Sequence, residues 1–167
     1  MLKVCTVVCM ATLVVASVES SVFAQGAGAK MQGNYNFWQA QGWQQQAQHQ
    51  SRALYYYGQT ENPTAEQAKE HAKAARSAVA SSQKHLAELK KANPDNKEAQ
   101  AAITKVESIN KKVLGHCDMC DQAIAKGDYK ECGACCAEIV HDLHDADAAM
   151  KTLQKALDIH HEVPKKK

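Results

Sequence analysis

Five cysteines in the second half of the chain are the residues best suited to chemistry. They form two groups: Cys117 and Cys120 in a C-x2-C spacing and, after eleven residues, Cys132, Cys135 and Cys136 in a C-x2-C-C spacing. Thiolate sulfur is a soft ligand that suits zinc, Cu(I) and iron-sulfur centres. The spacing therefore predicts a site for a soft metal ion.

The same cysteines can instead form disulfide bonds. Two bridges across a helical hairpin, such as Cys117 to Cys136 and Cys120 to Cys135 or Cys132, would tie its two helices together. Cysteines of exported small domains are commonly oxidised, although an odd number leaves one thiol over. We therefore keep a disulfide-stabilised helical interaction or structural module without metal as the alternative.

Two histidines extend the set of candidate ligands. His116 directly precedes Cys117, and His71 is expected at the same level of the fold as the cysteines. Between His116 and Ala148 the chain has eight acidic residues against two lysines, which favours a cation in this region. The candidate metal ligands are Cys117, Cys120, Cys132, Cys135, Cys136, His116 and His71.

The sequence holds no complete catalytic constellation. Glu138 and His141 make a single Glu-x-x-His step, whereas a di-iron carboxylate bundle needs two such steps and two further glutamates. The C-x-x-C-H pattern of covalent haem attachment does not occur. We therefore expect a binding protein and not an enzyme, with a copper or zinc ion as its cofactor.

Start and stop signals divide residues 34–163 into four helical segments. Three N-cap residues are each followed three positions later by Gln or Glu: Thr64, Asp95 and Asp128. The expected ends are Gly58, Asn93 before Pro94, Gly127 and Pro164. Apolar residues recur at steps of three and four, so each helix has one face to bury. Short loops between long helices then predict an all-α fold, an antiparallel up-down four-helix bundle.

The third and fourth helices are expected to form a tight hairpin at Gly127. Cysteines equally far from Gly127 would then face one another inside the bundle. Residues 116–120 read His-Cys-Asp-Met-Cys and residues 132–136 read Cys-Gly-Ala-Cys-Cys. These fragments of the hairpin 116–144 resemble the cysteine-rich four-helix-bundle copper-storage proteins, whose cysteines fill the bundle interior with Cu(I). Because the family has cysteines on all helices and this chain has none on the first two, the resemblance implies a site for one or a few ions.

The first residues have the layout of a secretory signal. Lys3 precedes an apolar run over residues 4–18, and Ala24 ends a Val-Phe-Ala stretch, so we expect a signal peptide over 1–24 that takes Cys5 and Cys9 with it. The run is shorter than the roughly 20 residues of a membrane-spanning helix, so no integral membrane anchor is expected. Residues 25–33 are expected to form a flexible linker and residues 164–167 a basic tail. The expected localisation is exported, periplasmic or extracellular.

The charge of the chain also bears on its partners. A formal net charge of +2 is too small to predict a concentrated basic face, so we expect no nucleic acid. The sequence predicts an exported protein that binds a soft metal ion, Cu(I) or Zn, with a Cys/His cluster at the hairpin of the third and fourth helices. The metal ion is the expected partner, and a protein partner or a homo-oligomer is left open.

Overall fold

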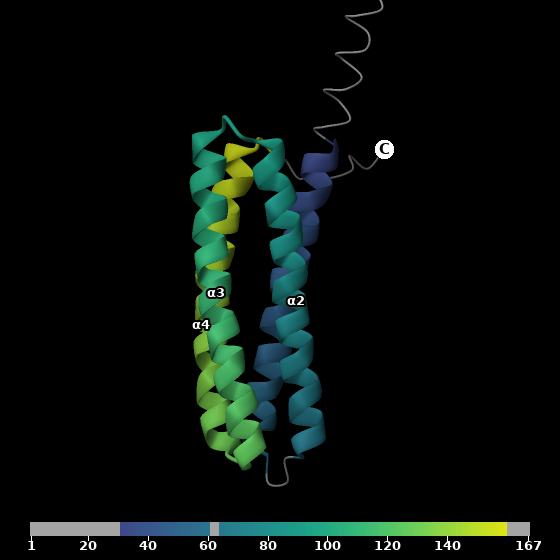
Figure 1. Cartoon of the computed structure of the whole chain (residues 1–167), viewed down its shortest axis with the longest axis vertical. Coiled ribbons are helices and arrows are strands. Elements are labelled where there is room, and N and C mark those ends of the chain that lie inside the picture. The colour runs from purple at the N-terminus through teal and green to yellow at the C-terminus, as the bar shows by residue number, and fades with distance from the viewer. Residues whose placement is uncertain (1–30, 61–63, 160–167) are drawn as a thin grey trace, which may run out of the picture. The chain divides into compact units, whose positions relative to one another are not determined.

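The computed structural model describes residues 31–60 and 64–159 of the chain, and these are helical apart from short turns. Residues 31–57 form the first helix, followed by α2 (Ala65–Ala92), α3 (Lys97–Lys126) and α4 (Tyr129–Ala156). The chain divides into two compact units, Met1–Tyr35 and Asn36–Lys167. In the second unit the four helices pack antiparallel, as Figure 1 shows, so the predicted all-α four-helix bundle is confirmed.

Several expectations fall outside the described residues. These are the signal peptide over 1–24, most of the linker over 25–33, the end of the fourth helical segment and the basic tail over 164–167. The chain is already helical at residue 31, three residues before the expected start of the first helix. Among the described residues, no helix combines the length and the hydrophobicity that a membrane span requires.

Two of the three predicted N-caps are confirmed and one is wrong by a residue. The side chain of Thr64 accepts from the backbone N of Gln67, and that of Asp128 accepts from the backbone N of Glu131. The cap of α3 is Asn96, not Asp95. The Oδ1 of Asn96 accepts from the N of Ala99 at 3.0 Å, while its Nδ2 donates to the carbonyl O of Ala156 at 2.9 Å. A carboxylate has no donor, so only the amide can cap α3 and hold the end of α4 at once.

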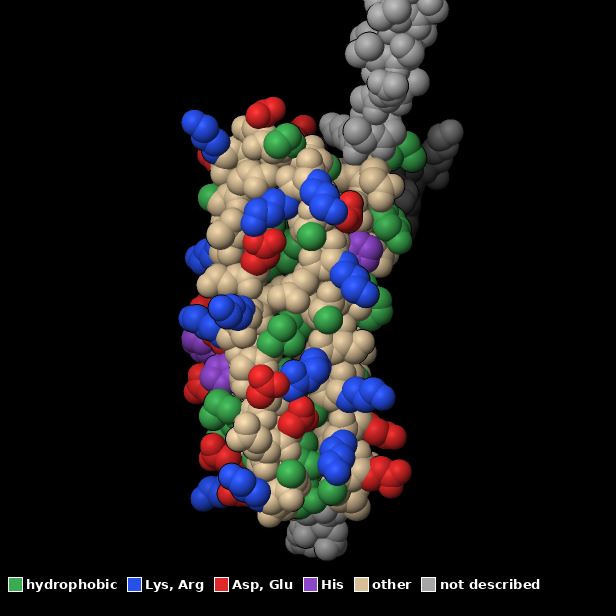
Figure 2. Space-filling view, viewed as in Figure 1, with side chains coloured by type: hydrophobic (Ala, Val, Ile, Leu, Met, Phe, Trp, Pro, Cys, Tyr) green, Lys and Arg blue, Asp and Glu red, His purple; other side chains and the backbone are tan. Residues whose placement is uncertain are grey.

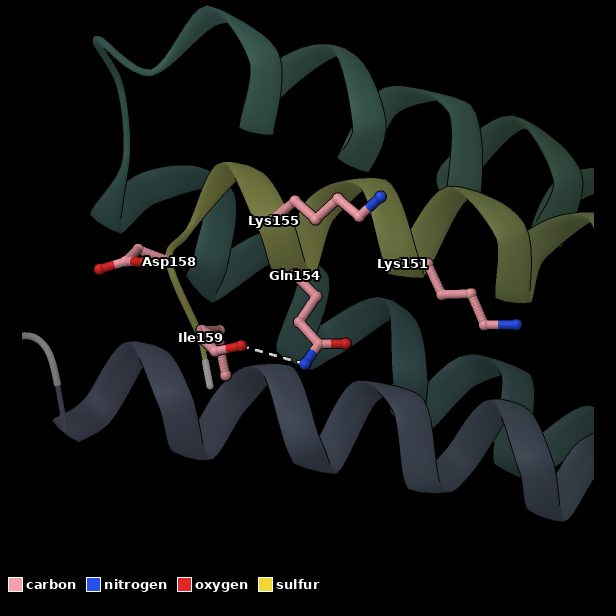
Figure 3. A pocket seen from close by; sticks show the side chains of 5 residues that line it. All are labelled: Lys151, Gln154, Lys155, Asp158 and Ile159. Atoms are coloured by element: carbon pink, nitrogen blue, oxygen red, sulfur yellow. Dashed lines mark hydrogen bonds between the residues drawn. The ribbon is translucent and has the colours of Figure 1, made fainter. Parts of the chain in front are cut away.

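The fourth helix ends before the proline that was expected to limit it. Its last helical residue is Ala156, and Asp158 adopts a left-handed conformation with φ of 52°. This turn folds Ile159 back, so that its N donates to the O of Gln154 and its side chain is buried. Figure 3 shows the Nε2 of Gln154 donating to the O of Ile159 at 3.0 Å, beside a cavity of about 430 Å³. The turn thus ends α4 because one residue that tolerates positive φ lets an apolar side chain return to the core.

The bundle core is mostly aliphatic and contains one layer of buried polar side chains. The Nε2 of Gln44, in the first helix, donates to the Oγ of Ser82 at 3.1 Å and to the Oδ1 of Asn110 at 2.8 Å. Ser82 donates in turn to the carbonyl O of Ala40 at 3.0 Å. These bonds join the first helix to α2 and α3 at one level. Such a layer favours one register of the helices, because a shift would break these three buried hydrogen bonds.

This layer gives a stability prediction. Gln44→Ala removes the donor shared by Ser82 and Asn110 and leaves a space in the core, so we expect the free energy of unfolding to fall by about 2 kcal/mol. Gln45→Ala is the matched control, because Gln45 is the exposed neighbour and its loss should change stability by less than about 0.5 kcal/mol. Urea denaturation followed by circular dichroism measures both. Equal effects would contradict a role for the layer.

The outer surface carries both signs of charge. Figure 2 shows acidic and basic side chains interspersed over the face formed by α2 and α3. The pattern is typical of helix faces that contact solvent. The cysteines lie on the opposite, inner faces of α3 and α4, where all five are buried.

Candidate metal centre

The turn between α3 and α4 places the cysteines. Gly127 ends α3 in the left-handed conformation, with φ of 72°, and its N donates to the O of Ile124. The N of Asp128 donates to the O of Ala123 at 2.9 Å, which completes the C-cap before Asp128 caps the next helix. The chain therefore reverses within two residues, as predicted. The inner face of α3 then lies against the inner face of α4.

Three thiols meet in the space that this hairpin encloses. The Sγ atoms of Cys120, Cys132 and Cys136 lie within 4.8 Å of one another, and all three residues are buried. The Sγ of Cys120 is 3.4 Å from the Sγ of Cys136 and donates to the carbonyl O of Cys132 at 3.5 Å. The expected convergence of cysteines inside the bundle is thus confirmed for these three, which we call the three-thiol cluster.

The other two cysteines flank the cluster. Cys117 lies one turn before Cys120 in α3, and Cys135 directly precedes Cys136 in α4. Both are buried, with 1% and 3% of their surface exposed. All five cysteines of the described residues are free thiols, so the structure contains neither of the disulfide pairings considered from the sequence.

The protons of the cluster are shared unequally. Hydrogen bonds with Cys132 and Cys136, and then burial, raise the pKa of the Cys120 thiol, which acts as a donor. The hydrogen bonds that Cys132 accepts from Cys120 and Cys136 lower the pKa of Cys132. The bond to Cys120 lowers the pKa of Cys136, but its bond to Cys132 together with burial raises that pKa on balance. Cys120 is therefore the thiol donor of the cluster.

Burial is the main influence on the pKa values of the two flanking thiols, Cys117 and Cys135. It raises the pKa of Cys117 to about 11, against the opposing effect of the positive charge of Arg76. Burial also raises the pKa of Cys135. Both flanking residues are consequently neutral thiols near pH 7. A thiol in this state becomes a ligand only when an ion displaces its proton.

The distances in the cluster suit a metal ion. Three sulfurs that each lie about 2.3 Å from a central ion are about 4 Å from one another in a trigonal arrangement. The cluster has one sulfur pair at 3.4 Å and all its pairs within 4.8 Å. Small rotations of the side chains therefore suffice to bring three ligands to one ion. The donor set is sulfur only, which is the preference of soft ions.

The two candidate histidines have other partners. The Nδ1 of His71 lies 2.8 Å from the Oε1 of Gln50, and its ring lies beside Tyr57 with centroids 6.4 Å apart. The Nε2 of His116 is 3.5 Å from the Oδ2 of Asp142. The three-thiol cluster includes neither histidine. Their assignment as metal ligands stays a prediction, and the geometry favours the thiols.

The close approach of the first helix to α4 depends on Gly58, a role that the sequence pattern did not reveal. A Cβ on Gly58 would lie 2.8 Å from the carbonyl O of Tyr129, and a Cβ on Gly133 would lie 3.9 Å from the carbonyl O of Tyr55. The end of the first helix thus packs directly on the start of α4. Although the first helix carries no cysteine, it closes this side of the layer that contains Cys132.

Arg76 is a second residue near the cysteines that the sequence did not point to. Its Nη1 and Nη2 bind the carboxylates of Asp118 and Asp121, on the same helix as Cys117. The only sequence signal is that arginine is rare here: it occurs at positions 52 and 76, whereas the other basic residues are lysines. A pattern of helical spacing does not show which α2 residue lies opposite which α3 residue.

Comparison of the chain with protein-family models, with curated proteins and with solved structures finds no match. The resemblance to copper-storage proteins is therefore supported only in its coarse features, a four-helix bundle with buried cysteines between α3 and α4. The chain is an all-α four-helix bundle whose three-thiol cluster could hold a metal ion.

Proposed function

We propose that this protein binds a soft metal ion, Cu(I) in the first place, at the three-thiol cluster. The single observation that carries the proposal is the convergence of the Sγ atoms of Cys120, Cys132 and Cys136, three buried residues, within 4.8 Å of one another. Three sulfurs with no other ligand type suit Cu(I), which accepts low coordination by thiolates. Burial excludes water and larger oxidants from the bound ion.

Zinc is the second candidate ion. Zinc and Cu(I) differ in the number of ligands that each requires. A structural zinc site has four ligands in a tetrahedral arrangement. The cluster supplies three, so zinc would need Cys117 or Cys135 as a fourth ligand. We favour Cu(I) because the three converging sulfurs already satisfy it. The flanking thiols would then bind a second ion or exchange with the first three.

The role we propose is holding or buffering of the metal, with no reaction of its own. The thiols are buried inside the hairpin, and burial favours retention of a bound ion. The secretion-like layout of residues 1–24 supports action outside the cytoplasm, in the periplasm or the extracellular space. There a buried thiolate site would protect Cu(I) from oxidation.

The test is a Cu(I) titration of anaerobically purified protein in competition with a chromogenic Cu(I) chelator. We expect at least one tightly bound Cu(I) per chain, an ultraviolet thiolate-to-copper charge-transfer band, and sulfur-only coordination by X-ray absorption. Zinc added at the same concentration should be displaced by Cu(I). The disulfide-stabilised module would give the opposite result: no bound metal, and one cysteine of the five that reacts with a thiol reagent before reduction, with the other four reacting only after it.

A further inference from the structure

Two sulfurs of the three-thiol cluster touch across the hairpin. The Sγ of Cys120, in α3, lies 3.4 Å from the Sγ of Cys136, in α4, and both residues are buried free thiols. A disulfide bond between them would have a length of about 2 Å, so the two sulfurs need to approach by only about 1.4 Å. This contact therefore has a second use besides the binding of an ion.

Helix geometry excludes disulfide bonds within either helix. Cys132 and Cys136 are four residues apart in α4, and Cys117 and Cys120 are three apart in α3. Side chains at these spacings have their Cβ atoms about 5–6 Å apart. A disulfide needs about 3.5–4.5 Å between its Cβ atoms. Any disulfide that leaves the helices intact must therefore join α3 to α4.

Among the cross-helix pairs of the cluster, the structure favours Cys120 with Cys136. The Sγ of Cys120 meets the carbonyl O of Cys132, at 3.5 Å, so its contact with Cys132 includes the backbone. Its contact with Cys136 joins sulfur to sulfur. Neither flanking cysteine has its sulfur in the cluster. The pair Cys120 and Cys136 is thus the one placed to react.

We propose that Cys120 and Cys136 are an oxidation site, joined reversibly into a disulfide bond by hydrogen peroxide, and that this bond switches off metal binding. The disulfide takes two of the three sulfurs of the cluster and leaves Cys132 as its one free thiol. The switch rests on the proposed function, whereas the oxidation site stands without it.

The reaction balances with one peroxide molecule for each disulfide. One thiol attacks a peroxide oxygen and the O–O bond breaks, which gives a sulfenic acid (S–OH) and, with the thiol proton, one water. The second thiol attacks the sulfenic sulfur: the S–S bond forms, the S–O bond breaks, and the released hydroxide takes the second thiol proton as another water. The two sulfurs lose two electrons, which reduce the peroxide. Peroxide is small and uncharged, so local opening of the helices suffices to admit it to a buried site.

The experiment treats reduced, metal-free protein with one equivalent of hydrogen peroxide and maps the product by mass spectrometry after blocking the remaining thiols. Cleavage of the chain before Asp118 separates Cys117 from Cys120, so the α3 partner is read directly from the peptides. We expect the fragment with Cys120 joined to the α4 fragment that holds Cys132, Cys135 and Cys136.

Two alanine variants identify the α4 partner. Cys135→Ala should form the bridge from Cys120 as wild type does, whereas Cys136→Ala should form none in the time that wild type needs for complete oxidation. Both changes exchange a buried thiol for a methyl group, so the fold should survive, and circular dichroism checks this. A bridge from Cys117, a bridge that survives in Cys136→Ala, or sulfinic acid in place of a disulfide would overturn the oxidation site.

The switch is tested on the same oxidised wild-type protein. We expect its Cu(I) affinity, measured against a chromogenic chelator, to fall by at least about 100-fold, more than the loss of a group that only supports the ligands. Reduction with a phosphine, removed before the titration, should restore it. If the oxidised protein binds Cu(I) as the reduced protein does, the switch is wrong. If the bridge forms but the reduced protein binds no Cu(I), the proposed function fails and the oxidation site remains.

Discussion

Cys136→Ala is expected to lower Cu(I) affinity by at least about 100-fold, more than the loss of a group that only supports the ligands. Cys136 is fully buried, and its sulfur lies 3.4 Å from that of Cys120 in the three-thiol cluster. Without it the cluster retains two sulfurs, and a third would have to come from Cys117 or Cys135, whose sulfurs lie outside the cluster. The fold should survive, because a free buried cysteine packs as a small apolar residue that alanine nearly replaces.

Cys135→Ala is the matched control for this prediction. It changes the adjacent residue, in the same helix and with similar burial, but removes a sulfur outside the three-thiol cluster. We expect its Cu(I) affinity to stay within about tenfold of wild type, a smaller loss than that of a first ligand. Competition with a chelator measures the Cu(I) affinity of both variants. The intensity of the thiolate-to-copper band reports the loss of a sulfur ligand directly. An equal or larger loss for Cys135→Ala would show that the ion is held by a different set of sulfurs.

The sequence predicted the hairpin well because its signals are local. Gly127 permits the positive φ of a helix C-cap, and Asp128 caps the helix that follows, so both helix ends are encoded within two residues. Helical spacing then decides which cysteines face inward. Counting residues from Gly127 brings Cys120 opposite the cysteines of α4, but it matches Cys120 with Cys135, whereas the structure clusters Cys120 with Cys132 and Cys136.

The sequence predicts helix ends and ion pairs less well where they depend on contacts between residues far apart in the chain. Asn96 caps α3 in place of Asp95 because its amide also reaches the end of α4, a contact sixty residues away. The fourth helix ends early because Ile159 finds a place in the core. The pairing of Arg76 with Asp118 and Asp121 depends on the relative register of α2 and α3. No local sequence pattern contains that register, so these three features are visible only in the folded structure.

Gly58→Ala is expected to destabilise the bundle by about 3 kcal/mol, the upper part of the usual range for overpacking. The added Cβ would lie 2.8 Å from the carbonyl O of Tyr129. The obstacle is a backbone atom at the start of α4, which no side-chain rotation can move. The end of the first helix must therefore shift away from α4, and the packing of Tyr55 beside Gly133 opens with it.

Gly42→Ala serves as the control, because a Cβ there would meet nothing within 4 Å. Gly42 lies inside the first helix, where alanine is favoured over glycine by about 0.5–1 kcal/mol. The same chemical change in the same helix should therefore raise the midpoint of urea denaturation at position 42 and lower it at position 58. If both variants are stabilised, the first helix does not approach α4 as closely as the structure has it. Opposite signs would instead locate the close contact at Tyr129, one turn before Cys132, where the first helix closes this side of the three-thiol cluster.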